Sequence, residues 1–219
     1  NLTIKHELLD LNSLQVDINT GNVTILGGGG GGGFDPDADP IKIGLNAGSI
    51  SQDIRSIAIG YEAAQFSQGL ASIALGAAAG QSNQEPTCIA IGASAGQTSQ
   101  GIRAFAVGTS AGKTNQGQSS IAIGALAGNQ SQSSNAVAIG TEAGSNNQNS
   151  DSIAIGHLSG QTSQHQNSIA IGHDAGRISQ NTVSIAIGYA AGEDYQSFNS
   201  IGIGYSAGKT SQKQSSVAI

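Results

Sequence analysis

The chain has 219 residues, a formal net charge of −6, 33 glycines, and only 10% charged and 4% aromatic residues. Weak charge together with many Ile and Ala residues excludes a typical disordered chain, which combines low hydrophobicity with high net charge. Scattered Lys and Arg in an acidic chain argue against nucleic acid as a partner. No apolar run reaches the ~18 residues of a transmembrane helix, so no membrane insertion is expected in this segment. The absence of Met and the start at Asn1 predict a fragment or a processed chain.

Residues 1–26 predict an N-terminal β segment. Apolar residues alternate with polar ones from Leu14 to Ile18 and again from Val23 to Ile25, and the residues between these runs, Asn19 to Asn22, favour a turn. Two alternating runs around such a turn are typical of a β-hairpin.

Residues 27–39 predict a linker that is rich in glycine and acidic residues. Seven consecutive glycines form its first part, and such a run is most simply a flexible joint. Asp35, Asp37 and Asp39 then alternate like the start of an EF-hand loop, but the Gly and Glu that this loop requires further on are absent. A solvated acidic turn is the default interpretation, and a looser Ca²⁺ site is the alternative.

From residue 40 onward the sequence repeats every 16 residues without an insertion or deletion. The repeat reads roughly S-I-A-I-G-x-x-A-G-x-T-S-Q-x-x-x, and a branched or aromatic residue flanks a small one on both sides before the first Gly. This alternation predicts a short strand, and no repeat carries a helix-length apolar pattern. That Gly recurs eleven times, at Gly44, Gly60, Gly76, Gly92, Gly108, Gly124, Gly140, Gly156, Gly172, Gly188 and Gly204.

Sixteen residues cannot bury a core alone, whereas stacked coils can pair their strands with the coils above and below. Residues 40–219 therefore predict an all-β domain, a parallel β-solenoid or β-roll of eleven 16-residue coils. The invariant Gly indicates a turn with positive φ or a close approach between backbones.

The small residue in the middle of each strand carries the expectation of an oligomer. We expect the flanking residues, such as Ile121 and Ile123, to face the coil interior, which would turn the small residue outward. A long stripe of small apolar groups on a surface usually marks an interface. The alternative is that the stripe faces a narrow part of the solenoid core. The predicted oligomer interface consists of Ala58, Ala74, Ala90, Ala106, Ala122, Ala138, Ala154, Ala170 and Ala186.

One Gln occupies the same position in all eleven repeats, although its neighbours vary freely. This pattern predicts a buried amide ladder in which each side chain donates to the next along the rod. The alternative is that each Gln caps a turn of its own coil, and both roles are structural. The ladder consists of Gln52, Gln68, Gln84, Gln100, Gln116, Gln132, Gln148, Gln164, Gln180, Gln196 and Gln212.

Four ring-bearing residues follow the invariant Gly in consecutive repeats: His157, His173, Tyr189 and Tyr205. On neighbouring coils the rings would lie about 4.8 Å apart. This stripe is a candidate surface for glycans or cell-wall polymer, and its His pair for a metal; the alternative is a surface or interface aromatic ladder. Cys88 takes the place of the usual Ser and is interpreted as a small buried residue.

The sequence carries no Ser/His/Asp constellation, metal-ligand cluster or phosphate loop. We therefore assign no catalytic residue, metal or other cofactor, and expect that the chain is not an enzyme. Polysaccharide-cleaving tailspikes also use β-solenoids, but a repeat without insertions offers no loops for a carboxylate cleft. A column containing Thr98, Thr114, Thr162 and Thr210 suggests ice binding, but Ile50, Phe66 and other residues interrupt it.

The recurring S-[IV]-A-[IV]-G motif, as in Ser120–Gly124 and Ser152–Gly156, resembles the head repeats of trimeric autotransporter adhesins. It is also similar to repeats of phage and large-virus fibre proteins. The resemblance covers residues 40–219, although this repeat is slightly longer and adds the Gln and a second Gly. It implies a left-handed parallel β-roll in which three chains pack around a common axis, and thus a homotrimer.

Together these features predict a structural segment of a surface fibre or adhesin. It would attach to a host cell or extracellular surface by displaying identical columns on three chains, so that weak contacts multiply. The expected partners are the chain itself and a host-surface glycan or protein, and the expected location is extracellular, on a virion or a bacterial cell surface. The alternatives are a spacer without receptor binding, an ice-binding protein and a glycan-degrading tailspike.

Overall fold

The computed structural model describes residues 14–16, 23–25 and 40–219. Strands β1 (Leu14–Val16) and β2 (Val23–Ile25) pair antiparallel, with Leu14 opposite Ile25. The predicted pairing of the N-terminal hairpin is thereby confirmed. The linker of residues 27–39, with Asp35, Asp37 and Asp39, lies outside the described residues.

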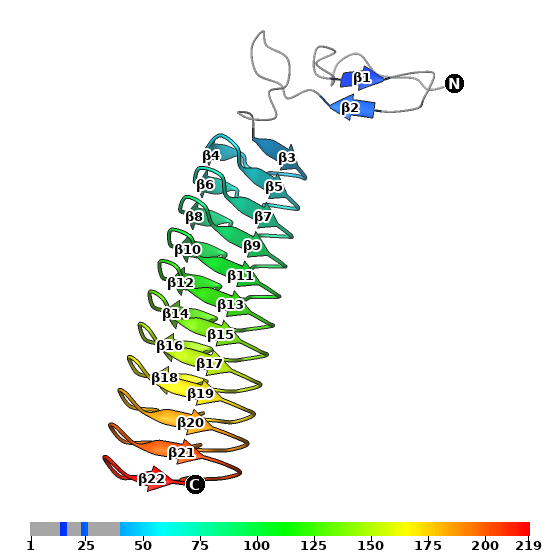
Figure 1. Ribbon diagram of the computed structural model, residues 1–219. Coiled ribbons are helices and arrows are strands. Elements are labelled where there is room, and N and C mark those ends of the chain that lie inside the picture. Colours follow the sequence, from blue (N-terminus) through cyan, green and yellow to red (C-terminus); the bar gives the residue numbers. More distant parts are fainter. Residues whose placement is uncertain (1–13, 17–22, 26–39) are drawn as a thin grey trace.

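Residues 40–219 form a parallel β-solenoid, and every element in this part of the chain is a strand (Figure 1). Strands of successive coils pair in parallel at an offset of 16 residues, as in the pairing of Ile121 with Val137. The predicted fold and the predicted 16-residue coil are confirmed. Two sheets run the length of the rod, one from the apolar part of each repeat and one from the polar part.

The first sheet has twelve strands and comes from the I-A-I part of the repeat. Its strands are β3 (Ile41–Ile43), β5 (Ile57–Ile59), β7 (Ile73–Leu75), β9 (Ile89–Ile91), β11 (Phe105–Val107), β13 (Ile121–Ile123), β15 (Val137–Ile139), β17 (Ile153–Ile155), β19 (Ile169–Ile171), β20 (Ile185–Ile187), β21 (Ile201–Ile203) and β22 (Val217–Ala218).

The second sheet has eight strands and comes from the T-S-Q part of the repeat. Single parallel bridges through Ile178, Asp194 and Thr210 continue it toward the C-terminus. Its strands are β4 (Ile50–Gln52), β6 (Phe66–Gln68), β8 (Ser82–Gln84), β10 (Thr98–Gln100), β12 (Thr114–Gln116), β14 (Gln130–Gln132), β16 (Asn146–Gln148) and β18 (Thr162–Gln164).

The invariant Gly is required by both backbone conformation and space. Gly124 has a φ of +127°, and a Cβ at this residue would lie 2.6 Å from the carbonyl oxygen of Gly140 in the next coil. No L-residue fits such a contact without a shift of the backbone. Both alternatives of the sequence interpretation, a positive φ and a close backbone approach, are therefore confirmed together.

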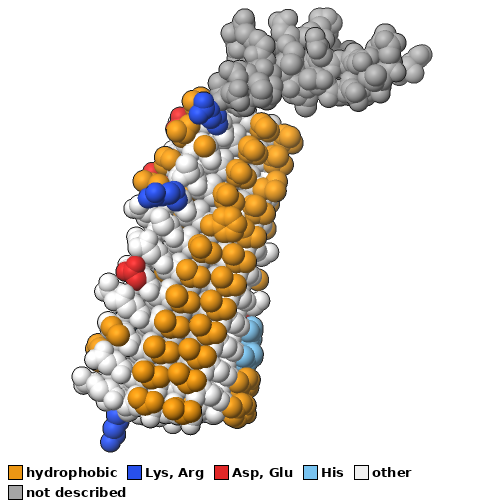
Figure 2. Space-filling view, viewed as in Figure 1, with side chains coloured by type: hydrophobic (Ala, Val, Ile, Leu, Met, Phe, Trp, Pro, Cys, Tyr) orange, Lys and Arg blue, Asp and Glu red, His pale blue; other side chains and the backbone are white. Residues whose placement is uncertain are grey.

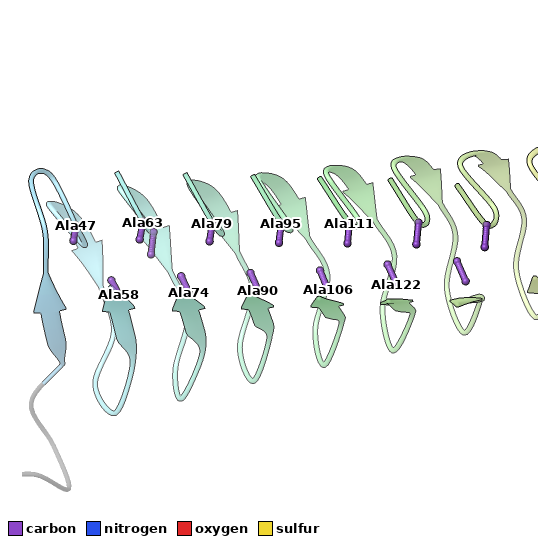
Figure 3. Packing of buried hydrophobic residues seen from close by; sticks show 14 of the residues in the cluster. Ala47, Ala58, Ala63, Ala74, Ala79, Ala90, Ala95, Ala106, Ala111 and Ala122 are labelled. Carbon is purple, nitrogen blue, oxygen red and sulfur yellow. The ribbon is translucent and has the colours of Figure 1, made fainter. Parts of the chain in front are cut away.

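The interior of the rod is built from alanine, and the predicted orientation of the first sheet is wrong. The mid-strand alanines from Ala58 to Ala186 are fully buried, whereas the flanking Ile121 and Ile123 are partly exposed on the outer side. Opposite them lies a second buried alanine column that includes Ala95 and Ala111 (Figure 3). Ala58, Ala74, Ala90, Ala106, Ala122, Ala138, Ala154, Ala170 and Ala186 therefore line the core and do not form an oligomer interface.

The physical reason for this reversal is the narrowness of the coil. Sheets that pack through large side chains lie about 10 Å apart, but here the tight Gly turns close the coil within 16 residues. A Cβ built on Gly160 would lie 3.2 Å from the Cβ of Ala154, which leaves no space there for a branched side chain. The alternative that the sequence left open, a narrow part of the core, is the one that the structure adopts.

The invariant Gln forms the polar half of the same interior. Gln100 is fully buried, and its Nε2 donates to Oε1 of Gln116 in the next coil at 3.1 Å. The same Nε2 also lies 2.9 Å from the carbonyl oxygen of Ile89 and 3.2 Å from that of Ala104. The predicted amide ladder and its alternative, backbone capping, thus occur in the same side chain. Nine ladder bonds link Gln52 to Gln68 and connect the members from Gln84 to Gln212.

The second Gly of the repeat leaves space for the Gln side chains of this ladder. At Gly112 φ is +52°, and a Cβ would lie 2.5 Å from Oε1 of Gln116. Ala64 is the exception in this column and adopts a φ of 46°. Gln68, in the same coil, donates only to backbone carbonyls and not to Gln84 in the next coil. The buried Oε1 of Gln84 therefore has no hydrogen-bond partner among the described residues. We attribute this interruption of the ladder to the methyl group of Ala64.

Candidate functional site

The outer face of the first sheet is a candidate functional surface because it is apolar from end to end. Its two columns of branched or aromatic residues flank the buried alanines and point to solvent, and Figure 2 shows hydrophobic columns along the whole rod. The exposed fraction is 36% at Ile123 in the middle of the rod and is larger near its ends, 55% at Ile43 and 64% at Val217. Sequence reasoning missed this surface because it assigned these residues to the interior.

The four predicted ring residues form one continuous ladder on the surface. Ring centroids lie 4.9 Å apart between His157 and His173, 5.1 Å between His173 and Tyr189, and 5.2 Å between Tyr189 and Tyr205. These separations agree with the coil spacing expected from the sequence. Tyr205 is 80% exposed, and histidines border the apolar face in Figure 2.

The orientation of the rings limits what this ladder can bind. Tyr189 and Tyr205 are stacked with an interplanar angle of 8°, and His173 and Tyr189 with an angle of 13°. Stacked rings cover each other's faces and leave their edges for polar contacts, such as those of the two His173 nitrogens with Asp174 and His157. A sugar that packs on an aromatic face finds those faces covered between adjacent rings. The ladder thus favours polar or metal ligands over sugar stacking.

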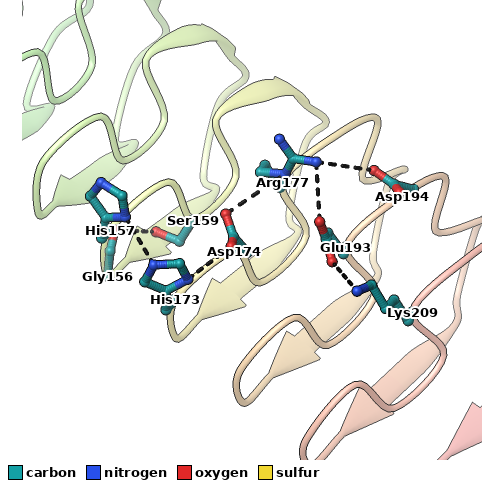
Figure 4. Close-up of polar contacts among 9 residues, drawn as sticks. All are labelled: Gly156, His157, Ser159, His173, Asp174, Arg177, Glu193, Asp194 and Lys209. Carbon is teal, nitrogen blue, oxygen red and sulfur yellow. Dashed lines mark hydrogen bonds and ion pairs between the residues drawn. The ribbon is translucent and has the colours of Figure 1, made fainter.

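A network of charged side chains lies beside the histidines on consecutive coils (Figure 4). Arg177 Nη2 lies 3.1 Å from Glu193 Oε1 and 3.8 Å from Asp194 Oδ1, and its Nε lies 3.7 Å from Asp174 Oδ1. Lys209 Nζ lies 3.2 Å from Glu193 Oε2, and this carboxylate raises the pKa of Lys209. Arg177, Glu193 and Lys209 alternate in charge at 16-residue steps, a signal that was present in the sequence and was missed.

Cys88 is fully buried, as predicted. Its Sγ donates to the carbonyl oxygen of Gly101 at 2.8 Å, and burial raises the pKa of the thiol to about 11. A thiol in this state is a poor nucleophile, because the thiolate is the reactive form. Cys88 therefore fills the place of a buried Ser and contributes to packing.

A shallow groove of about 520 Å³ lies along β8, β10 and β12 and is open to solvent. Asn83, Ser99 and Asn115 contribute to its lining, and Glu85 is its single ionisable lining residue. Glycosidic bonds are usually cleaved by a pair of carboxyl groups. The groove lacks such a pair and offers amide and hydroxyl groups instead.

Comparisons with protein-family models, with curated proteins and with solved structures find no match. Within residues 14–16, 23–25 and 40–219, no helix is long and apolar enough to cross a bilayer. The candidate surfaces are thus defined by geometry alone: the outward isoleucine columns, the ring ladder and the charged network beside it.

Proposed function

We propose that the chain is a structural segment of a surface fibre or adhesin that works as a homotrimer. It attaches to a host cell or extracellular surface by displaying identical columns on three chains. Its location is extracellular, on a virion or a bacterial cell surface, and no catalytic step belongs to its role. The observation that carries this proposal is the outward apolar face of the twelve-stranded sheet.

The size of that face supports association with further copies of the chain. Twelve strands spaced about 4.8 Å apart give a length near 58 Å, and two side-chain columns give a width near 10 Å, so the face covers roughly 600 Å². This value is at the upper end of the ~300–600 Å² that the largest patch on a monomer covers. It also approaches the ~800 Å² that each partner buries in a standard interface.

The free energy gained by burying this face also favours association. Full burial of ~600 Å² at ~25 cal/mol per Å² stabilises an assembly by about 15 kcal/mol per chain. The loss of rigid-body freedom costs about 4–15 kcal/mol for each association. A flat face made of branched side chains can therefore hold copies of the rod together, and a second copy presents a face of matching periodicity.

The number of chains follows from the resemblance to the adhesin head repeats, which pack in threes. In a trimer the isoleucine faces meet around the axis and the polar sheets point outward. Each chain then presents columns of Ser, Thr, Asn and Gln side chains at 16-residue steps. Contacts that are weak on one coil multiply over many coils and three chains.

A spacer without receptor binding is the second candidate. The stacking of His173, Tyr189 and Tyr205 favours it, because ring faces that cover one another do not offer a platform for sugars. The polar groove near Glu85 favours attachment instead, because amide and hydroxyl groups line it and can bind polar ligands.

The test compares assembled and monomeric forms of the same rod. Ile155→Glu with Ile171→Glu places charges on the outer face of β17 and β19, and is expected to give a folded monomer. Gln130→Glu adds a charge to the exposed side of β14 and is the control that leaves assembly intact. Each form is applied to a glycan array and to intact cells, and binding is measured.

Attachment by multivalent display predicts binding by the unmodified chain and the control, and a strong loss in the monomeric variant. Equal binding by monomer and assembly would contradict the multivalent mechanism. Assembly without binding to either target would favour the spacer.

A further inference from the structure

The ring ladder brings two imidazole nitrogens face to face. Nδ1 of His157 and Nε2 of His173 lie 3.2 Å apart on adjacent coils (Figure 4). Both side chains are exposed, so a solute can reach them without any opening of the rod. Because the parallel pairing of β17 with β19 sets the register, the two histidines are held at one coil spacing.

Asp174 determines which nitrogen of His173 is available. Its Oδ2 lies 2.8 Å from His173 Nδ1 and favours the tautomer that carries the proton there. Nε2 then keeps its lone pair and faces His157. In the neutral pair, the N–H at Nδ1 of His157 donates a hydrogen bond to this lone pair. When the proton of His157 is on Nε2 instead, both facing nitrogens carry lone pairs.

Neighbouring side chains contact the His173 ring and bias its orientation. Tyr189 stacks on the far side of His173 with an interplanar angle of 13°. Arg177 lies 3.7 Å from Asp174 Oδ1 and is itself paired with Glu193 at 3.1 Å. A carboxylate that orients a histidine from behind is the usual outer support of a metal-binding imidazole.

We propose that a divalent transition-metal ion, of which Zn²⁺ is the test case, binds between His157 Nδ1 and His173 Nε2. With metal–nitrogen distances of ~2.05 Å, nitrogens 3.2 Å apart subtend roughly 100° at the ion, close to the tetrahedral angle. The ion takes the place of the proton between the nitrogens, and that proton moves to Nε2 of His157. The exposed rings can turn so that both lone pairs converge on the ion.

The donor set determines the class of ion and leaves its coordination incomplete. Imidazole suits Zn²⁺, Cu²⁺ and Ni²⁺, whereas Ca²⁺ and Mg²⁺ prefer oxygen ligands. Within the described part of the chain, no third His, Cys, Asp or Glu side chain completes a cluster. The remaining positions are therefore filled by water and are open to exchange with a donor group from another molecule.

The experiment is calorimetric titration of ZnCl₂ into the full chain in neutral buffer. About one ion per chain is expected, and MgCl₂ is expected to give no heat. His157→Ala and His173→Ala should each weaken binding by more than ~10-fold, because even an outer-sphere partner contributes ~10–100-fold. Asp174→Asn should weaken it by about 10-fold without changing the stoichiometry.

His165→Ala is the matched control, because it removes a histidine from a different column of the same rod. It should leave the affinity unchanged. A second readout uses CuCl₂ and the unmodified chain, where electron paramagnetic resonance should show coupling to two imidazole nitrogens. The proposal would be overturned by absent binding, by binding that survives loss of both ring-column histidines, or by an equal loss in His165→Ala.

Discussion

The two sides of strand β13 differ in burial, because one faces the interior of the rod and the other faces outward. Ala122 points inward and is fully buried, while Ile123 points outward and is 36% exposed. In most half-buried sheets the larger apolar side chain faces the core. Here the larger side chain is outside because the interior beside this strand leaves space only for a methyl group, and buried Gln side chains occupy the rest. Residue size relative to the enclosed volume, and not hydrophobicity alone, decides which side of the strand is buried.

Loss of the interior amides is expected to have the largest effect. Gln116→Ala together with Gln132→Ala removes the donors to Phe105 O and Ile121 O and interrupts the ladder. Unpaired buried groups cost about 1–3 kcal/mol each, and each truncation also leaves a cavity. We expect the free energy of unfolding to fall by about 5 kcal/mol, measured by chemical denaturation. An unchanged value would mean that these side chains are solvated.

Exchanging the two sides of β13 tests the comparison directly. Ala122→Ile adds three carbons where the coil has no space, and overpacking should destabilise the rod by about 3 kcal/mol. Ile123→Ala on the outer side should cost about 1 kcal/mol when both changes are made in the monomeric Ile155→Glu and Ile171→Glu variant, since in a single chain that side chain is already partly in water. Thermal unfolding monitored by circular dichroism measures both. If the truncation costs more than the insertion, the assignment of the two faces is wrong.

Repair of the interrupted ladder is expected to stabilise the rod slightly. Ala64→Gly removes the methyl group beside Gln68 and should let Gln68 reach the unpaired Oε1 of Gln84. One additional buried hydrogen bond is worth about 1 kcal/mol. The reverse change, Gly112→Ala, is the matched control and should destabilise, because its Cβ would lie 2.5 Å from Gln116 Oε1. Loss of stability in Ala64→Gly would contradict the proposed cause of the interruption.

A similarly small effect is expected at an exterior turn. Val183 has a φ of 56°, a left-handed conformation that a β-branched residue adopts at a cost. Asn135, Asn167 and Asn199 occupy the same turn in other coils with nearly the same φ. Val183→Asn should raise the free energy of unfolding by about 1 kcal/mol, and Asn199→Val should lower it by a similar amount. Equal stability of all three proteins would show that the turn is unstrained.

The sequence predicted the parts of the fold that the repeat itself encodes. An uninterrupted 16-residue period sets the strand register, and a Gln that never varies indicates a ladder whose members must match. The orientation of Ile121 and Ala122 could not be predicted in this way, because both faces of the strand are apolar. That orientation depends on the distance between the two sheets, which is set by turns at residues such as Gly124 with φ of +127°.

Of the candidate surfaces, the ring ladder was predicted from the repeat and the isoleucine face was not. The ring ladder was found because His157, His173, Tyr189 and Tyr205 share one column, and column members must be neighbours in a solenoid. The bonding of His173 to Asp174 depends on side-chain torsions, which a repeat pattern does not encode. The isoleucine face was missed because branched side chains in a strand usually indicate burial.

The most direct test of the account is the mass of the 219-residue chain in solution, measured by light scattering after size exclusion. An outward isoleucine face that joins three copies predicts about three times 21.7 kDa. It also predicts a fall to the single-chain mass in the Ile155→Glu and Ile171→Glu variant, with an unchanged circular dichroism spectrum. A stable monomer of 21.7 kDa for the unmodified chain would contradict the central claim.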